Sequence, residues 1–89
     1  PGVYLEGKYG IRIETILEVV DHMENESGRF LSFEPLTLVP FDRNLIDPDY
    51  LTPYTRKLLN EYHERVRIEI MPLLSAADQE WLISQTEPI

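Results

Sequence analysis

The apolar positions of this chain change their spacing near residues 40–50. Before this region they alternate with polar residues or cluster with β-branched types, which is typical of strands. After it they recur every three or four residues, as they do along one face of a helix. The pattern therefore predicts an α+β chain in which antiparallel strands are followed by two helices.

The strands are expected over three stretches. Residues 3–5 form a short one that closes in a turn through Gly7 and Gly10, and strict alternation over residues 11–20 predicts a second. The polar residues 21–29 are interpreted as a loop. Residues 30–39 form the third strand, where Pro35 lacks an N–H donor and indicates an edge position or a bulge.

The helices carry their own start and stop signals. Thr52 has the side chain of an N-cap and Pro53 suits the first helical position, while Pro72 should end or kink the helix. Ser75 followed by Asp78 is a capping signal for a short second helix. Between the two prolines one apolar stripe predicts a helix of about 18–20 residues; it comprises Leu58, Leu59, Tyr62, Val66, Ile70 and Leu73.

The composition limits the kinds of site and partner that this chain can have. The 89 residues include no cysteine and carry a formal net charge of −8, so thiolate chemistry is excluded and a nucleic-acid partner is not expected. No apolar run approaches the roughly 18–20 residues that span a bilayer, so no membrane partner and a cytoplasmic location are expected. Since Pro1 is not a natural start, we expect the chain to be a piece of a longer protein.

The candidate functional groups are carboxylates. His22 in the expected loop and His63 in the expected helix are interpreted as structural, the first solvated and the second partly buried and hydrogen-bonded. Glu14 and Glu34 are different, because each interrupts the middle of an otherwise apolar strand.

A hairpin without a bulge would bring these two carboxylates together. A turn near residues 24 and 25 gives paired residue numbers that add to roughly 48–50, and a total of about 48 sets Glu14 opposite Glu34 on one face. Such a pair needs a shared proton, a cation or a metal ion, and Arg12 could supply one positive charge. Alternatively, a bulge at Pro35 shifts the register and both carboxylates reach water.

The chain resembles the C-terminal end of aminopeptidase P, the Xaa-Pro aminopeptidases of the pita-bread metallopeptidase superfamily. Gly10-Ile11-Arg12-Ile13-Glu14 is the stretch shared across the superfamily. The stretch from Phe33-Glu34-Pro35 to Pro40 and the helical tail are more specific to aminopeptidase P. Shorter matches occur at Pro1-Gly2-Val3-Tyr4, Leu45-Ile46-Asp47, Leu59-Asn60-Glu61-Tyr62-His63, and from Trp81-Leu82 to Pro88-Ile89.

The resemblance implies the C-terminal part of a pita-bread fold, with the metal-ligand strands in residues 1–40 and a helical extension of the same domain in residues 41–89. It implies a site of two divalent metal ions, usually manganese, with Glu14 as one ligand, Glu34 as a bridging ligand and Arg12 beside them. The implied activity is hydrolysis of the bond before a penultimate proline, in an enzyme expected to be a homodimer.

The family's two Asp ligands and its His ligand lie upstream of the matched region. The isolated chain is therefore expected to be inactive, and to associate with the remainder of the catalytic domain, self-associate or be marginally stable. Two alternatives stay open: a non-catalytic pita-bread binding or assembly module, and another superfamily peptidase such as a prolidase or a methionine aminopeptidase.

Overall fold

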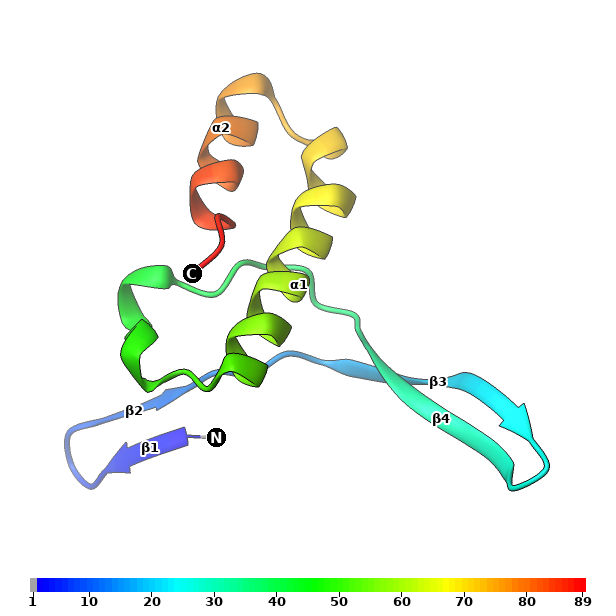
Figure 1. Ribbon diagram of the computed structural model, residues 1–89. Coiled ribbons are helices and arrows are strands. Elements are labelled where there is room, and N and C mark those ends of the chain that lie inside the picture. Colours follow the sequence, from blue (N-terminus) through cyan, green and yellow to red (C-terminus); the bar gives the residue numbers. More distant parts are fainter. Residues whose placement is uncertain (1) are drawn as a thin grey trace. The chain divides into compact units, whose positions relative to one another are not determined.

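The structure is a computed structural model that describes residues 2–89, so Pro1 lies outside the described residues. The chain divides into two compact units, the first ending at Thr37 and the second running from Leu38 to Ile89. The first unit holds antiparallel strands and the second holds two α-helices (Figure 1). The expected order of antiparallel strands followed by two helices is confirmed.

The first hairpin joins β1 (Gly2–Leu5) to β2 (Tyr9–Arg12). Its turn contains Gly7, whose φ of 68° lies in the left-handed region that glycine adopts without strain. Gly10 is set opposite Tyr4, and a Cβ at Gly10 would come within 2.7 Å of the tyrosine ring. The glycine thus lets the aromatic ring cross over the neighbouring strand.

The second hairpin joins β3 (Leu17–Asn25) to β4 (Gly28–Pro35), and it corrects the expected loop over residues 21–29. Both strands run through this polar stretch to a tight turn, in which Asn25 Oδ1 accepts the N–H of Ser27 at 2.8 Å. Arg29 donates to both carboxylate oxygens of Asp21 across the strands. Polarity did not exclude strand structure here, because both faces of the hairpin are open to solvent.

The strand expected over residues 11–20 is broken, since β2 ends at Arg12 and β3 begins at Leu17. The strand expected over residues 30–39 is also different, because β4 begins earlier and ends at Pro35. Pro35 is paired with Leu17 at the end of the ladder, where a missing N–H costs no interior bond.

The helices begin where the capping signals predict. Thr52 caps α1 (Pro53–Ile70), and its hydroxyl accepts the N–H of Thr55 at 3.1 Å. Ser75 caps α2 (Ala76–Gln85) through the N–H of Asp78. Pro72 lies in the short 3-10 turn η3 (Met71–Leu73) that follows α1, so the expected end of the helix at this proline is confirmed. No helix among residues 2–89 is long and apolar enough to cross a membrane.

The core of the helical unit is small. Val66 and Leu82 are its buried apolar side chains in the described part of the chain, and His63 and Thr86 are buried with them. The segment before α1 contains the 3-10 turns η1 (Arg43–Leu45) and η2 (Pro48–Tyr50), neither of which has a buried residue.

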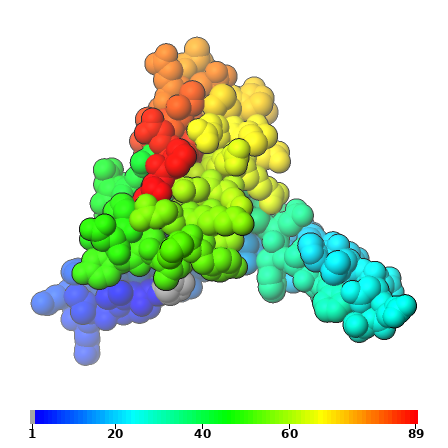
Figure 2. Space-filling model, in the orientation of Figure 1, coloured from blue at the N-terminus to red at the C-terminus, as the bar shows by residue number. Residues whose placement is uncertain are grey.

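The C-terminal tail is fastened to this unit by two polar side chains. Asn60 exchanges two hydrogen bonds with the backbone of Ile89, and Arg43 donates to the carbonyls of Ser84, Glu87 and Pro88. In the space-filling view the tail, in red, lies against the yellow-green atoms of α1 (Figure 2).

Candidate metal centre

Glu14 lies in the extended segment between β2 and β3, directly after the first hairpin. Arg12 Nη2 lies 2.7 Å from Glu14 Oε2, so the guanidinium expected beside this carboxylate does contact it. Both side chains are more than half exposed. An ion pair this exposed contributes little to the stability of the fold.

The chain next to Glu14 is held in place by the second hairpin. Ile16 O accepts the N–H of Leu36 at 2.8 Å, and Thr15 Oγ1 donates to Thr37 O at 3.1 Å. These bonds continue the pairing of β3 with β4 beyond the ladder. They fix the backbone directly after Glu14, although Glu14 itself belongs to no strand.

Glu34 does not face Glu14. Paired residue numbers near it add to 52, which sets Glu34 opposite Glu18 on β3. The bulge-free pairing that joined Glu14 to Glu34 is therefore wrong. The turn lies at residues 26 and 27 instead of 24 and 25, and a bulge at His22 takes up one residue.

The alternative register also differs from the observed one, because the bulge is at His22 and Pro35 ends the ladder. Both glutamates are nevertheless solvent-exposed, as that alternative expected. Glu18 is the carboxylate that sequence reasoning missed. The alternation placed it beside apolar residues, as it did Glu14, but only the register shows that it is the cross-strand neighbour of Glu34.

The two histidines lie apart from this segment in the chain. His22 is exposed, but on a strand and at the bulge rather than in a loop. His63 lies in α1 and is completely buried, not partly as expected, and its Nε2 accepts the N–H of Phe41 at 3.1 Å.

These side chains alone do not make a dinuclear metal centre. Among residues 2–89 no three His, Asp or Glu side chains are grouped so that they could hold a metal ion. Carboxylate oxygens suit hard divalent ions, so Glu14 can supply a ligand, but the described residues do not complete a metal site by themselves.

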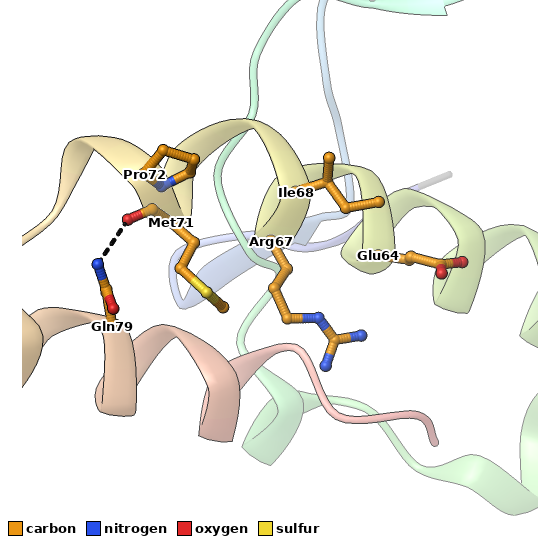
Figure 3. Close-up of a pocket in the computed structure, with 6 residues that line it drawn as sticks. All are labelled: Glu64, Arg67, Ile68, Met71, Pro72 and Gln79. Carbon is orange, nitrogen blue, oxygen red and sulfur yellow. Dashed lines mark hydrogen bonds between the residues drawn. The ribbon is translucent and has the colours of Figure 1, made fainter.

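The helical unit offers no second candidate centre of this kind. A hollow of about 490 Å³ lies between α1 and α2, lined by Glu64, Arg67, Ile68, Met71, Pro72 and Gln79. Gln79 Nε2 donates to Met71 O at 3.1 Å, and Arg67 extends along the wall (Figure 3). One carboxylate beside a guanidinium does not favour a cation there.

Comparison with known proteins gives three results. Residues 29–89 match the family model described as the C-terminal region of peptidase_M24. The whole chain is 39% identical to the human Xaa-Pro aminopeptidase 2 and 42% identical to aminopeptidase P1 of Lotus japonicus. In both cases the match covers 100% of this chain and 14% of the relative, so the chain spans about one seventh of their length.

The structural comparison agrees with these matches. A crystal structure of the X-prolyl aminopeptidase of Caenorhabditis elegans is similar with a TM-score of 0.85 and 37% sequence identity. The similarity covers 100% of this chain and 15% of that one. The nematode protein is described as a cytosolic enzyme with a di-nuclear active site.

Proposed function

The chain belongs to the family defined by the C-terminal region of the M24 peptidases, and from this we propose that it is the C-terminal segment of a metal-dependent Xaa-Pro aminopeptidase. One observation carries the proposal: the Caenorhabditis elegans enzyme reproduces the whole fold of this chain, at a TM-score of 0.85. Because the chain spans 15% of that structure, the activity belongs to a longer protein of which this segment is one part.

The proposed reaction is hydrolysis of the bond between an N-terminal residue and a penultimate proline. Two divalent metal ions would activate water and neutralise the charge that develops on the scissile carbonyl oxygen. Manganese as the metal, a homodimeric parent enzyme and a cytosolic location are parts of the same proposal. The remainder of the catalytic domain is the partner on which all of them depend.

Glu14 is the residue of this chain that we propose as a metal ligand. Its carboxylate is accessible, it follows the stretch from Gly10 to Ile13, and Arg12 holds it by a 2.7 Å contact. Arg12 is proposed as a positioning residue that fixes one carboxylate oxygen and leaves the other for a metal. Glu34 is proposed as the bridging ligand that the resemblance implies, and the resemblance is its support, because the observed register sets it opposite Glu18 and not opposite Glu14.

The test uses the full-length protein that contains this segment. Glu14→Ala should remove bound metal, measured by inductively coupled plasma mass spectrometry, together with hydrolysis of an Xaa-Pro peptide. Glu24→Ala is the matched control, since it removes an exposed carboxylate at the turn end of β3, away from both candidate ligands. Full metal content and normal turnover in the Glu14→Ala variant would contradict the proposal.

Glu34→Ala, measured in the same way, separates the two candidate ligands. Loss of metal and turnover in this variant would make Glu34 a ligand as the resemblance implies. Retention of both would leave Glu14 as the ligand that this chain supplies. Replacement of bound metal by Mn²⁺ in a chelator-treated sample tests the identity of the metal, with recovery of turnover as the readout.

A further inference from the structure

Two neighbouring side chains of α1 hold the backbone segment that precedes η1. Tyr62 Oη donates to Val39 O at 2.8 Å and accepts the N–H of Val39 at 3.3 Å. His63 Nε2 accepts the N–H of Phe41 at 3.1 Å. Both ends of each contact lie in the helical unit, and together they pair two successive helix residues with alternate residues of the segment.

The segment is also packed through rings. The Phe41 ring lies 5.0 Å from that of Tyr62 and 6.2 Å from that of His63, measured between centroids. His63 has no solvent exposure, and its Nδ1 is buried without a hydrogen-bond partner among the described residues. Water therefore does not reach the imidazole while the segment stays in place.

This arrangement fixes the protonation state of His63. An Nε2 that accepts a backbone N–H must keep its lone pair, so the ring is neutral and its proton is on Nδ1. A proton on Nε2 would put two donors face to face and bury a charge with no acceptor.

The surrounding charges act in the same direction. Burial lowers the pKa of His63 first, and Arg43 from η1 and Arg67 from α1 lower it further. The carboxylate that the tail brings to this region, on Glu87, lies 3.6 Å from Arg43. The imidazole is thus flanked by cations, and its hydrogen bonding offers no carboxylate to stabilise an imidazolium.

We propose that Tyr62 and His63 form an acid-sensitive latch, in which protonation of His63 releases residues 39–41 from α1. The ligand of this device is the proton itself. The latch acts on the backbone between β4 and the helices, and it is independent of the metal site and of the proposed peptidase activity.

The direction of the pH effect follows from the protonation states. In the released state the imidazole meets water and takes up a proton near its ordinary pKa of about 6.5. In the closed state the pKa is lower, so the open state binds more protons as the pH falls below about 6.5. Above that pH the full free-energy difference favours the closed state. This difference decreases as the pH falls from about 6.5 to the lowered pKa.

Amide hydrogen exchange in the full-length protein tests the latch. After correction for intrinsic exchange rates, protection of the Val39 and Phe41 amides should fall on the order of tenfold between about pH 7.5 and pH 5. In the His63→Gln variant the amide oxygen can still accept the Phe41 N–H but does not titrate, so protection should be the same at both pH values. His22→Gln is the matched control and should behave like the parent protein.

Equal protection of the parent protein at both pH values, or an unchanged loss in His63→Gln, would overturn the proposal. A second measurement needs no variant and covers the case in which His63→Gln does not fold. Deuterium exchange at the imidazole C2 position, followed by mass spectrometry, gives a titration midpoint for each histidine. The midpoint of His63 should lie below the ordinary histidine pKa of about 6.5, and a midpoint at or above that value would also overturn the latch.

Discussion

At the scale of single residues, the contact between Arg12 and Glu14 should matter more for metal affinity than for the stability of the fold. Exposed ion pairs contribute about 0–1 kcal/mol to stability, so this one is not needed to hold the hairpin. A side chain that orients a metal ligand has a larger effect on the metal, typically about 10–100-fold in affinity. The two effects can therefore be measured apart.

Arg12→Ala in the full-length protein should weaken metal binding by about 10–100-fold while the thermal unfolding midpoint changes little. Metal affinity is measured by titration against a competing chelator. Lys57→Ala, which removes the exposed pair between Lys57 and Glu61, is the control and should change neither quantity. Unchanged metal affinity in Arg12→Ala would show that the guanidinium does not orient a ligand.

The small core of the helical unit leads to a second prediction about single residues. Leu82 is 1% exposed, so Leu82→Ala should destabilise the unit by about 2–5 kcal/mol through lost burial and a residual cavity. Leu73 is 78% exposed and its replacement by alanine should cost less than about 0.5 kcal/mol. Hydrogen exchange of the α1 backbone amides measures the loss of stability in both variants. Similar exchange in the two variants would contradict the assignment of Leu82 to the core.

At the scale of elements, the parts that sequence patterns predicted are those that depend on near neighbours. The caps at Thr52 and Ser75 involve residues three positions away, and the end of α1 follows from the ring of Pro72. The hairpin register depends instead on the position of one turn and one bulged residue. The turn at residues 26 and 27 and the bulge at His22 both lie in the stretch that was expected to be a loop. Together they set Glu34 opposite Glu18.

The same reasoning explains which parts of the site were accessible from sequence. Arg12 and Glu14 are two residues apart on an extended segment, so their contact followed from local spacing. The long-range pairing of Glu34 did not. The burial of His63 was also underestimated, because it depends on Phe41, which lies 22 residues earlier in the chain.

The cap of α1 can be tested directly. Thr52→Ala removes the oxygen that accepts the Thr55 N–H and should cost about 1 kcal/mol of helix stability. Thr52→Ser retains the hydroxyl and is the matched control, with little expected change. Amide exchange in the first turn of α1 is the readout, and equal exchange in both variants would show that the cap does not hold this end.

At the scale of the whole molecule, the hairpin unit exposes many apolar side chains. Val19 and Phe33 are cross-strand partners and are 56% and 68% exposed. An open, uncovered sheet of this kind requires a partner surface. In the proposed enzyme the remainder of the catalytic domain provides it.

The 89-residue chain by itself should therefore bind the dye ANS and sediment as a species larger than its 10.4 kDa. Changing Val19 and Phe33 together to serine should reduce both effects in this chain. In the full-length protein the same double change should instead destabilise, because there the side chains are proposed to be covered. A monomeric chain without dye binding would contradict the need for a partner surface.

The contacts of Arg43 have a further consequence for the order of assembly during translation. The carbonyls that it binds belong to Ser84, Glu87 and Pro88, more than forty positions later in the chain. The contact between Phe41 and His63 needs only half that distance, so it can form while the second helix is still inside the ribosome. Until residue 88 has emerged, the guanidinium of Arg43 is hydrated and lacks these carbonyl partners. We therefore expect α2 and the tail to dock onto it only at the end of synthesis of this segment.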